Sequence, residues 1–503
     1  MTKQGKVWLI GAGPGDPGLL TIKGKECLER ADAVVYDRLA DPRILAYVRP
    51  EAERIYVGKA SSQHTMKQPD INKLLVKLAA EGKRVARLKG GDSFVFGRGG
   101  EEALELYEAG LPFEFVPGIT SAIAVPEYAG IPVTHRHVAT SFAVITGHED
   151  PTKGASTINW SGLATAVDTL VFLMGVENLK HITEELIAHG RSADTPAALI
   201  RWGTHPEQRT LETTLGQAYA AVQAAQFKAP AIFIVGNVVA LRKELAWFDK
   251  KPLFGKTIVV TRARAQASAL TAALEEQGAK VLEVPAIKLT PVANYDLLDQ
   301  ALADLQNYQW LVFTSANGVE AFFARLEHKG LDSRALARAQ IAAIGTATAA
   351  ALRAHGLVAD VIPPSFKAED LVQALTPCLK KGARVLLPRA KVAREVLPES
   401  LRELGVTVDV VPVYETVLDA SGKEQLLQAL ESGAVDYVTF TSSSTVTNLV
   451  QMLDNNIALL SGVKLAAIGP ITAATCAKAG LKVAVTAQTY TIQGLVEALN
   501  QNI

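Results

Sequence analysis

Residues 7–18 read Val-Trp-Leu-Ile-Gly-Ala-Gly-Pro-Gly-Asp-Pro-Gly, an apolar run followed directly by a loop rich in glycine and proline. The run has the length and composition of a buried strand, and the stretch after the loop is helical in character. Because glycines let a backbone approach a ligand closely, the segment predicts a strand, a ligand-binding loop and a helix. Strand-type runs alternate with helical stretches throughout this half, which predicts an α/β fold. Further such runs lie at residues 33–36, 85–88, 142–145, 169–173 and 232–235.

The same loop also contains the pattern Gly13-x-Gly15-x-x-Gly18, which matches the dinucleotide-binding fingerprint. Asp37 lies 19 residues further on, where a ribose-binding acid is expected. A nicotinamide oxidoreductase is therefore the first alternative. Against it, the two prolines of the loop remove two backbone N–H groups that a pyrophosphate needs.

Composition limits the classes of partner. The chain has 503 residues, 49% hydrophobic and 20% charged, which is typical of two to four folded domains. Its 51 Lys and Arg cancel its 51 Asp and Glu, so no overall field favours nucleic acid or an anionic membrane. An anionic substrate must be held by local arginines and backbone amides.

Cysteine usage and apolar runs predict the compartment. Cys27, Cys378 and Cys476 have no metal or redox spacing and are interpreted as single buried thiols, so no metal site is expected. The N-terminus has no signal-peptide pattern, and no apolar run reaches the roughly 18 residues of a membrane helix. We therefore expect a cytoplasmic protein.

Seven further motifs follow the loop in order, and none of them is typical of a nicotinamide enzyme. They are Val34-Val-Tyr-Asp-Arg-Leu39, Val57-Gly-Lys59, Arg87-Leu-Lys-Gly-Gly-Asp-Ser-Phe-Val-Phe-Gly-Arg-Gly-Gly100, Val116-Pro-Gly-Ile-Thr-Ser-Ala122, Gly130-Ile-Pro-Val-Thr-His-Arg136, Thr146-Gly-His148 and Arg201-Trp-Gly-Thr204. Together with the loop they resemble the uroporphyrinogen-III C-methyltransferases, members of the tetrapyrrole methyltransferases that use S-adenosylmethionine. The resemblance covers about residues 5–245. It implies two α/β subdomains with the active site in a cleft between them.

The resemblance also implies a set of residues that contact S-adenosylmethionine. Asp92 has a local capping role as its alternative, and Met174 has a place in the core. Two mild departures from the family pattern are Ser93, where proline is usual, and Val95, where isoleucine is common. The implied cofactor residues are Pro14, Gly90, Gly91, Asp92, Val95, Thr120, Ser121, Met174 and Gly203.

The methyl-transfer chemistry needs alignment and proton movement more than activation, because the pyrrole carbon is already electron-rich. By resemblance, Asp37 is the proton acceptor and Lys59 the proton donor. Asp37 ends an apolar strand, where burial would raise the pKa of a carboxyl group; a strand-end cap and a solvated lysine are the alternatives. The substrate carries eight carboxylates, so arginines within the motifs are expected to bind it, although solvated surface positions are as common. These arginines are Arg38, Arg98 and Arg136.

The second half begins after residues 248–255, where charge, proline and glycine interrupt the α/β pattern. It contains an internal repeat. An offset of 127 pairs Arg262 with Arg389 and Thr314-Ser315 with Thr441-Ser442, and a further slip of three residues pairs Ala343-Ile-Gly345 with Ala467-Ile-Gly469. The repeat predicts two similar α/β lobes.

Several segments of this half resemble the uroporphyrinogen-III synthases, and their order carries the resemblance. They are Gly255-Lys-Thr-Ile-Val-Val-Thr-Arg262, Val312-Phe-Thr-Ser-Ala-Asn317, Ala343-Ile-Gly-Thr346, Leu387-Pro-Arg389, Val413-Tyr-Glu-Thr416, Phe440-Thr-Ser442 and Ala467-Ile-Gly-Pro-Ile-Thr472. The resemblance implies two lobes joined by two connecting strands. We therefore expect a methyltransferase domain over 1–248, a linker over 249–255 and a synthase domain over 256–503. Lobe one would combine about 256–286 with 416–503, and lobe two would span about 293–410.

The synthase half shows no constellation of His, Cys or paired carboxylates, which fits an enzyme that mainly imposes a conformation. By resemblance, Tyr414 assists the departing hydroxyl of the linear substrate; a packed tyrosine is the alternative. Hydroxyls and amides at the ends of strands suit carboxylate arms, with ordinary helix capping as their alternative. The predicted substrate-binding residues are Arg262, Thr314, Ser315, Thr441, Ser442 and Thr472.

The combined resemblance predicts a bifunctional enzyme of sirohaem or cobalamin biosynthesis. The second half would close hydroxymethylbilane to uroporphyrinogen III with inversion of one ring. The first half would methylate that product twice with S-adenosylmethionine to give precorrin-2. Methylation of a later corrinoid precursor and a non-catalytic two-lobed binding module remain alternatives for the two halves. The resemblance also suggests a homodimer through the methyltransferase half.

Overall fold

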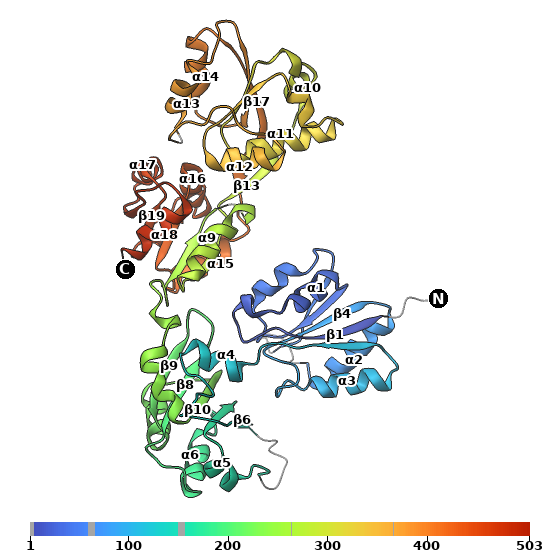
Figure 1. The fold of residues 1–503 in the computed structure, drawn as a ribbon, viewed down its shortest axis with the longest axis vertical. Helices are drawn as coiled ribbons and strands as arrows, with labels where there is room; N and C mark the ends of the chain where they lie inside the picture. Colours follow the sequence, from blue (N-terminus) through green and yellow to red (C-terminus); the bar gives the residue numbers. More distant parts are fainter. Residues whose placement is uncertain (1–4, 59–65, 149–155, 263, 366, 503) are drawn as a thin grey trace. The chain divides into compact units, whose positions relative to one another are not determined.

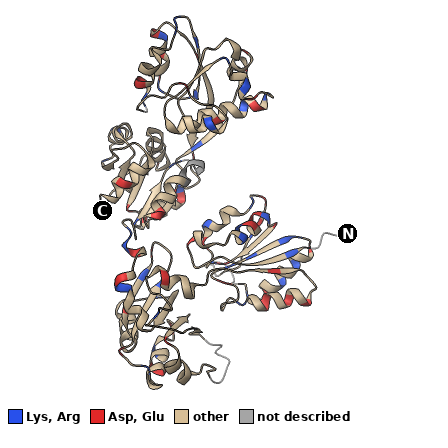
Figure 2. Ribbon diagram, in the orientation of Figure 1, with Lys and Arg blue, Asp and Glu red and all other residues tan. Residues whose placement is uncertain are grey.

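The chain, seen in a computed structural model, divides into two compact units, which we describe separately (Figure 1). The structure describes residues 5–58, 66–148, 156–262, 264–365 and 367–502. The first unit runs to Thr257 and includes Leu274–Lys280, and the second comprises Ile258–Ala273 and Val281–Asn502. Both are layered α/β structures, as the sequence predicts. Basic and acidic residues are interspersed along both units, in line with the neutral composition (Figure 2).

The first sheet of the first unit is parallel and has the strand order β3-β2-β4-β1-β5. Both of its faces are covered, because β1 alternates between two cores: Trp8 and Ile10 pack on the α1 side, and Val7 and Leu9 on the α2 and α3 side (Figure 1). Its elements are β1 (Lys6–Gly11), α1 (Ile22–Arg30), β2 (Ala33–Tyr36), β3 (Glu53–Tyr56), α2 (Gln68–Ala80), β4 (Arg84–Lys89), α3 (Gly99–Glu108) and β5 (Phe113–Val116).

The second sheet of this unit is mixed, in the order β6-β7-β10-β8-β9. β6 and β7 are parallel, whereas β10 runs antiparallel to both β7 and β8. Helix α4 packs its Val125 and Ala122 into the core of this sheet. The elements are α4 (Ser121–Tyr128), β6 (Phe142–Thr146), α5 (Trp160–Ala166), β7 (Thr169–Leu173), α6 (Leu179–Ala188), β8 (Pro196–Arg201), β9 (Arg209–Thr214), α7 (Ala218–Ala224), β10 (Ala231–Val235) and α8 (Arg242–Leu245).

The segment that the sequence marks as a boundary is ordered where it leaves the first unit. Phe248 is 5% exposed and its ring lies 4.9 Å from that of Tyr128 in α4. The Lys251 ammonium lies 5.1 Å from the Trp247 ring. The beginning of the predicted linker is therefore a short 3-10 turn, Phe248–Lys250, held on the first unit by aromatic packing.

The second unit contains two five-stranded sheets, ordered β12-β11-β18-β19-β20 in lobe one and β13-β17-β16-β14-β15 in lobe two. The strands of lobe one are β11 (Thr257–Val260), β12 (Lys280–Glu283), β18 (Tyr437–Phe440), β19 (Lys464–Ala467) and β20 (Val483–Thr486). Those of lobe two are β13 (Ile287–Pro291), β14 (Trp310–Phe313), β15 (Gln340–Ala343), β16 (Arg384–Ala390) and β17 (Thr407–Leu418). The helices are α9 (Arg264–Glu276), α10 (Asp296–Ala303), α11 (Ala316–His328), α12 (Thr346–Ala354), α13 (Ala368–Leu375), α14 (Val396–Glu403), α15 (Lys423–Glu431), α16 (Ser443–Met452), α17 (Pro470–Lys478) and α18 (Ile492–Asn500).

The internal repeat is visible in these sheets, but its two copies are interleaved. The offset of 127 superimposes β14 on β18, β11 on the start of β16 and β12 on the start of β17. Lobe one therefore combines β11 and β12 of the first copy with β18 and β19 of the second. Lobe two combines β14 and β15 of the first copy with β16 and β17 of the second. The long strand β17 continues past β16 to pair antiparallel with β13, so the crossing between lobes is a two-stranded ladder.

Two further expectations can be compared with the fold. Cys27 and Cys476 are buried as predicted, but Cys378 is exposed, because it lies in the turn after α13 and not on an apolar helix face. Within the described ranges, no helix has the length and apolar character needed to cross a membrane.

Three loops of the first sheet approach one another closely after β1, β4 and β5. A Cβ added to Gly118 would lie 2.5 Å from the Gly11 Cα and would also collide with the Gly91 carbonyl oxygen. Gly91 donates to Gly13 at 2.7 Å and Gly13 donates back at 3.2 Å. The loops are thus packed backbone against backbone, and no side chain fits between them.

We predict that Gly118→Ala destabilises the first unit by at least about 1–3 kcal/mol, because the added methyl group meets backbone that cannot rotate away. Urea unfolding followed by tryptophan fluorescence measures this, since four of the five tryptophans lie in that unit. Gly100→Ala is the control, because its added methyl group would lie 3.8 Å from the nearest atom. Equal stability of the two variants would contradict the prediction.

Candidate active sites

The predicted cofactor residues lie at two sheet edges of the first unit, in the loops that follow the strands. In the first sheet, Tyr36 pairs with Leu88 and Ile10 pairs with both Leu88 and Val116, so the four strands end in one row. The loops that follow are therefore at one edge, where ligands bind in α/β sheets. They carry Asp37, Pro14, Gly90, Gly91, Asp92, Thr120 and Ser121.

The other predicted cofactor residues follow strands of the second sheet, whose register again places them at one edge. Ile232 pairs with both Leu173 and Ile200, so β7 and β8 end at one edge. Met174 and Gly203 follow these ends. The structure places Met174 at the surface, with 53% of the side chain exposed, so the core alternative for it is wrong.

Helix α4 links the two edges. A Cβ on Gly91 would lie 3.8 Å from the Ser121 nitrogen at the start of α4. A Cβ on Gly203 would lie 2.5 Å from the Val125 Cγ2 one turn further along the helix. Val95, in the loop after β4, packs against the core that contains Val125. Loops from both sheets therefore meet around the first two turns of α4.

A latch of hydrogen bonds fixes the glycine-proline loop to the second sheet. Asp16 donates its backbone N–H to the Thr204 hydroxyl at 3.0 Å, and its carboxylate accepts from the Tyr128 hydroxyl at 2.8 Å. Gln208 completes the latch by accepting from the Thr204 N–H and donating to the Tyr128 carbonyl. Burial raises the pKa of Tyr128 above its ordinary value, so its hydroxyl remains a donor at neutral pH.

The close packing at this latch explains Gly15. Its φ is 154°, and a Cβ there would lie 2.6 Å from the Cδ2 of His205. Burial lowers the pKa of His205, so the imidazole that faces the loop is neutral at physiological pH.

Backbone strain gathers in the loops of this site. Nine described residues other than glycine have positive φ, and five of them follow β4, β7 or β8. Such conformations cost about 1–3 kcal/mol each and occur where function requires them. The five residues are Phe96, Arg98, Met174, Trp202 and Thr204.

The Asp92 carboxylate has a local role in the structure. Its two oxygens accept from the Phe94 N–H at 2.8 Å and from the Gly118 N–H at 2.9 Å. The side chain thus ties the loop after β4 to the loop after β5. This local role corresponds to the alternative to cofactor contact that the sequence leaves open for Asp92.

Asp37 lies at the predicted strand end, and its surroundings are charged. One oxygen accepts from the Leu39 N–H at 3.0 Å, and the other lies 3.4 Å from the Arg87 guanidinium. The side chain is 26% exposed. The carboxylate is therefore partly buried, as a strand-end position suggests, and an arginine also faces it. Lys59 lies outside the described residues.

The three predicted substrate arginines are exposed. Arg98 is held by Glu101 in a two-point ion pair at 2.7 and 2.8 Å. Exposed apolar side chains lie in the same loops, a combination that suits a flat macrocycle with carboxylate arms. They are Leu39, Phe94, Phe96 and Ile119.

In lobe two, Ser315, which follows β14, meets Tyr414 from the middle of the long strand β17. The Tyr414 hydroxyl lies 3.2 Å from the Ser315 Oγ, and Ser315 also caps α11 by accepting from the Gly318 N–H. Thr314 precedes this pair at the end of β14.

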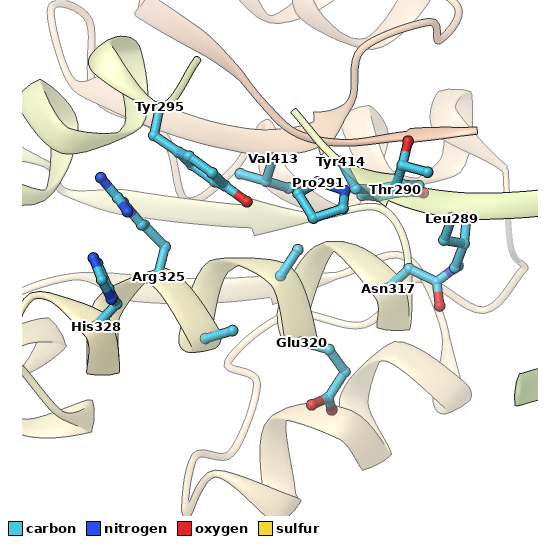
Figure 3. A pocket seen from close by; sticks show the side chains of 12 residues that line it. Leu289, Thr290, Pro291, Tyr295, Asn317, Glu320, Arg325, His328, Val413 and Tyr414 are labelled. Carbon is cyan, nitrogen blue, oxygen red and sulfur yellow. The ribbon is translucent and has the colours of Figure 1, made fainter. Parts of the chain in front are cut away.

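A cavity of about 460 Å³ beside this pair is walled by α11, β13 and β17 (Figure 3). Tyr414, Asn317 and Thr290 lie toward one end, and Tyr295 and Arg325 toward the other (Figure 3). Arg325 is already paired with Asp299 at 2.6 and 2.7 Å. The cavity therefore gives a ligand access to Tyr414, whereas the charge of its arginine is already paired.

Lobe one has a corresponding strand-end set. Arg262 follows β11 and is half-buried, and burial lowers its pKa. Ser442 caps α16 in a capping box with Thr445, and Thr441 precedes it. Thr472 is 5% exposed in the first turn of α17. For Ser315 and Ser442 the capping alternative is observed, which leaves their free lone pairs available to a ligand.

Comparisons with known proteins match both halves. Residues 6–219 match the family of Tetrapyrrole (Corrin/Porphyrin) Methylases, and residues 268–497 match the family Uroporphyrinogen-III synthase HemD. The porphyrin biosynthesis protein HemD of Ruminiclostridium josui is 40% identical over 498 residues, covering 99% of this chain and 98% of that protein. The chain is a fusion of a tetrapyrrole methylase and a uroporphyrinogen-III synthase.

Relatives of the methylase half alone are also similar. The uroporphyrinogen-III C-methyltransferase of Priestia megaterium is 52% identical over 236 residues, 47% of this chain and 99% of that protein. A uroporphyrin-III C-methyltransferase from Thermus thermophilus, solved in complex with S-adenyl homocysteine, is 41% identical and covers 47% of this chain and 99% of its own, with a TM-score of 0.41. The predicted fusion is confirmed.

The methylase half does not present a dinucleotide cradle. The loop runs into a three-residue 3-10 turn, Pro17–Leu19, whose N-cap is Asp16, and α1 begins only at Ile22. The Gly13, Asp16 and Gly18 amides are already bonded within the latch or the loop. The nicotinamide alternative is therefore wrong, because the loop amides serve the fold and not a pyrophosphate.

The sequence did not single out several residues that build these sites. Asp16 lies in the glycine-proline loop and Thr204 in the motif Arg201-Trp-Gly-Thr204, so these motifs could have indicated both residues. Tyr128 and Gln208 carry no such signal, because their partners are 112 and 80 residues away in the chain.

We predict that Tyr128→Phe destabilises the methylase half by about 1–2 kcal/mol, because the Asp16 carboxylate loses the hydrogen bond from the Tyr128 hydroxyl. It should also weaken S-adenosylmethionine binding, since the loop is released from the second sheet. Urea unfolding and calorimetric titration measure the two effects. Tyr219→Phe, at a position 41% exposed, should change neither; unaltered stability in Tyr128→Phe would refute the latch.

Proposed function

We propose that the synthase half closes hydroxymethylbilane to uroporphyrinogen III with inversion of one ring. The methylase half then methylates that product twice to precorrin-2, the precursor of sirohaem and cobalamin. The main support is the relative that is 40% identical over 99% of this chain, because it carries both halves in one protein. The product of the second half is the substrate of the first, which gives the fusion a chemical reason.

S-adenosylmethionine fits the methylase site as its methyl donor. Gly91, with a φ of 68°, leaves its backbone open beside Thr120 and Ser121, where adenosine and amino-acid groups can be bonded. Met174 and Val95 add apolar contact. When bound, S-adenosylmethionine supplies a methyl group from its sulfonium. Pro14, Gly90, Asp92 and Gly203 complete the proposed cofactor residues.

The chain's own residues then align the substrate and move protons. We assign to Asp37 the acceptance of the proton that the macrocycle loses after methylation, and to Lys59 the donation of a proton. The exposed Arg38, Arg98 and Arg136 would bind carboxylate arms of the substrate. The electron-rich pyrrole carbon needs no further activation by the protein.

In the synthase half, catalysis is mainly conformational. Loss of a hydroxyl from hydroxymethylbilane leaves a reactive intermediate, and the two lobes must hold it so that only the inverted ring closes. Tyr414 would donate to the departing hydroxyl from the position that Ser315 fixes. Arg262, Thr314, Ser315, Thr441, Ser442 and Thr472 would hold its carboxylate arms.

The domain bounds 1–248 and 256–503, joined by 249–255, belong to the proposal, as do a cytoplasmic location and a homodimer through the methylase half. Leu104 and Tyr107, exposed one turn apart on α3, offer an apolar contact for a second copy. Light scattering tests the dimer.

An anaerobic assay of the purified chain with hydroxymethylbilane, with and without S-adenosylmethionine, tests the whole proposal. We expect uroporphyrinogen III without the cofactor and a product with two added methyl groups with it. Formation of the type I isomer alone would instead favour a non-catalytic binding module. Conversion of a later corrinoid and not of uroporphyrinogen III would favour the other alternative.

We predict that Asp37→Ala abolishes methyl transfer, because no group remains to accept the proton, while S-adenosylmethionine binding is retained. Mass spectrometry of the products and calorimetric titration of the cofactor separate the two effects. Asp168→Ala is the control, since this carboxylate bonds Thr140 and Ser141 outside the site. Full turnover by Asp37→Ala would remove Asp37 from the mechanism.

We predict that Tyr414→Phe lowers the rate of uroporphyrinogen III formation by about 100-fold or more, the usual loss for a proton donor. The matched control is Tyr308→Phe, which removes a hydroxyl bonded to Asp409 at 2.7 Å. Tyr308 precedes β14, whereas Ser315, the partner of Tyr414, follows β14. Product isomers are resolved by chromatography. Equal rates for the two variants would assign Tyr414 a packing role.

A further inference from the structure

A layer of buried charges lies directly behind Asp37. β4 contributes Arg87 and Lys89, which are 3% and 5% exposed, and α3 contributes Glu102, which is fully buried. The Glu102 Oε1 accepts from Arg87 at 3.1 Å, from Lys89 at 2.6 Å and from Gln68 of α2 at 2.9 Å. The three charged side chains of this layer are therefore almost completely covered.

The layer is incomplete without Asp37. Arg87 and Lys89 carry two positive charges, and Glu102 carries one negative charge. Buried charges are stable only when they are paired. Among the described residues, Asp37 is the other carboxylate in contact with Arg87. Burial and, second, the field of Arg87 lower the pKa of Lys89, while Glu102 and Asp37 oppose this effect.

Arg87 is itself rigidly held. Its Nε donates to Glu102, and its Nη1 donates to the Leu88 carbonyl at 3.1 Å and the Val35 carbonyl at 3.4 Å. Its Nη2 is then directed at the Asp37 Oδ2. Because the Asp37 Oδ1 takes the Leu39 N–H, both carboxylate oxygens are oriented from inside the protein.

We propose that Arg87 is a positioning residue of the methylase reaction, which orients the Asp37 carboxylate through the buried layer with Glu102 and Lys89. The inference rests on the proposed role of Asp37 as proton acceptor. The charged groups that face Asp37 are Arg87 directly and, through it, Glu102 and Lys89, while the neighbouring Arg38 is exposed. An arginine suits this place because it keeps its proton at every working pH.

The chain provides a matched control on the same two strands. Asp32 precedes β2 and pairs with Arg84 at the start of β4 through two bonds of 2.9 Å. Asp37 follows β2 and pairs with Arg87 near the end of β4. Arg84→Met therefore breaks an equivalent pair between the same strands at the edge away from the site.

The experiment measures methylation of uroporphyrinogen III from pH 5.5 to 9 and the Kd of S-adenosylmethionine in the full chain and its Arg87→Met, Arg87→Lys and Arg84→Met variants. For Arg87→Met we expect kcat to fall about 10-fold or more, with a Kd within about twofold of the unsubstituted chain. The acidic limb of its kcat profile should move, because the cation that faces the Asp37 carboxylate is removed.

Arg87→Lys keeps the charge in the layer and covers the case in which Arg87→Met does not fold. We expect it to leave the acidic limb in place and to recover part of kcat, since one ammonium cannot reproduce the forked geometry. Arg84→Met should leave both the profile and the Kd unchanged. The proposal is overturned if kcat is unaffected, or if kcat and cofactor binding fall together with an unmoved profile.

Failure of this inference can be distinguished from failure of the proposed function. If the unsubstituted chain makes no methylated product, or if Asp37→Ala keeps full turnover, the role of Asp37 fails and this inference with it. If the unsubstituted chain is active and Asp37→Ala is inactive while Arg87→Met behaves as Arg84→Met does, only the role of Arg87 is overturned.

Discussion

The methylase half depends on the contact of bare backbone between the loops that follow β1, β4 and β5. Gly11, Gly91 and Gly118 lie so close that a methyl group added to Gly11 or to Gly118 would overlap main-chain atoms of the other two glycines. Main chain does not yield as a side chain does, so this contact fixes the spacing of the loops. The carboxylate of Asp92 reinforces it by bonding the Gly118 amide. The open backbone of Gly91 and the start of α4 are consequently held in place before any ligand arrives.

Polar groups then tie the second sheet to the first. The latch of Asp16, Tyr128 and Thr204 joins loops from both sheets, and Val95 adds an apolar contact beside it. A ligand that binds between these loops meets a strained but pre-organised backbone. The buried charges behind Asp37 extend the same principle, because Arg87 contacts this carboxylate from the buried layer.

The synthase half is built in a different way, from a repeated unit. Each lobe combines strands from both copies of the repeat, and β17 with β13 forms the ladder where the chain crosses. Because the copies are interleaved, neither can complete a sheet alone. Equivalent positions in the two lobes carry an arginine and a Thr-Ser pair.

The sequence by itself determined the strands, the α/β class and the two families, because alternating apolar runs and contiguous motifs are local properties of the chain. It also placed Asp37 at a strand end and Tyr414 on a connecting strand. Only the tertiary structure decided what surrounds them. Arg87 reaches Asp37 across 50 residues, and Tyr414 reaches Ser315 across 99. Such contacts follow from strand order and register, which depend on the packing of the whole sheet and leave no pattern in neighbouring residues.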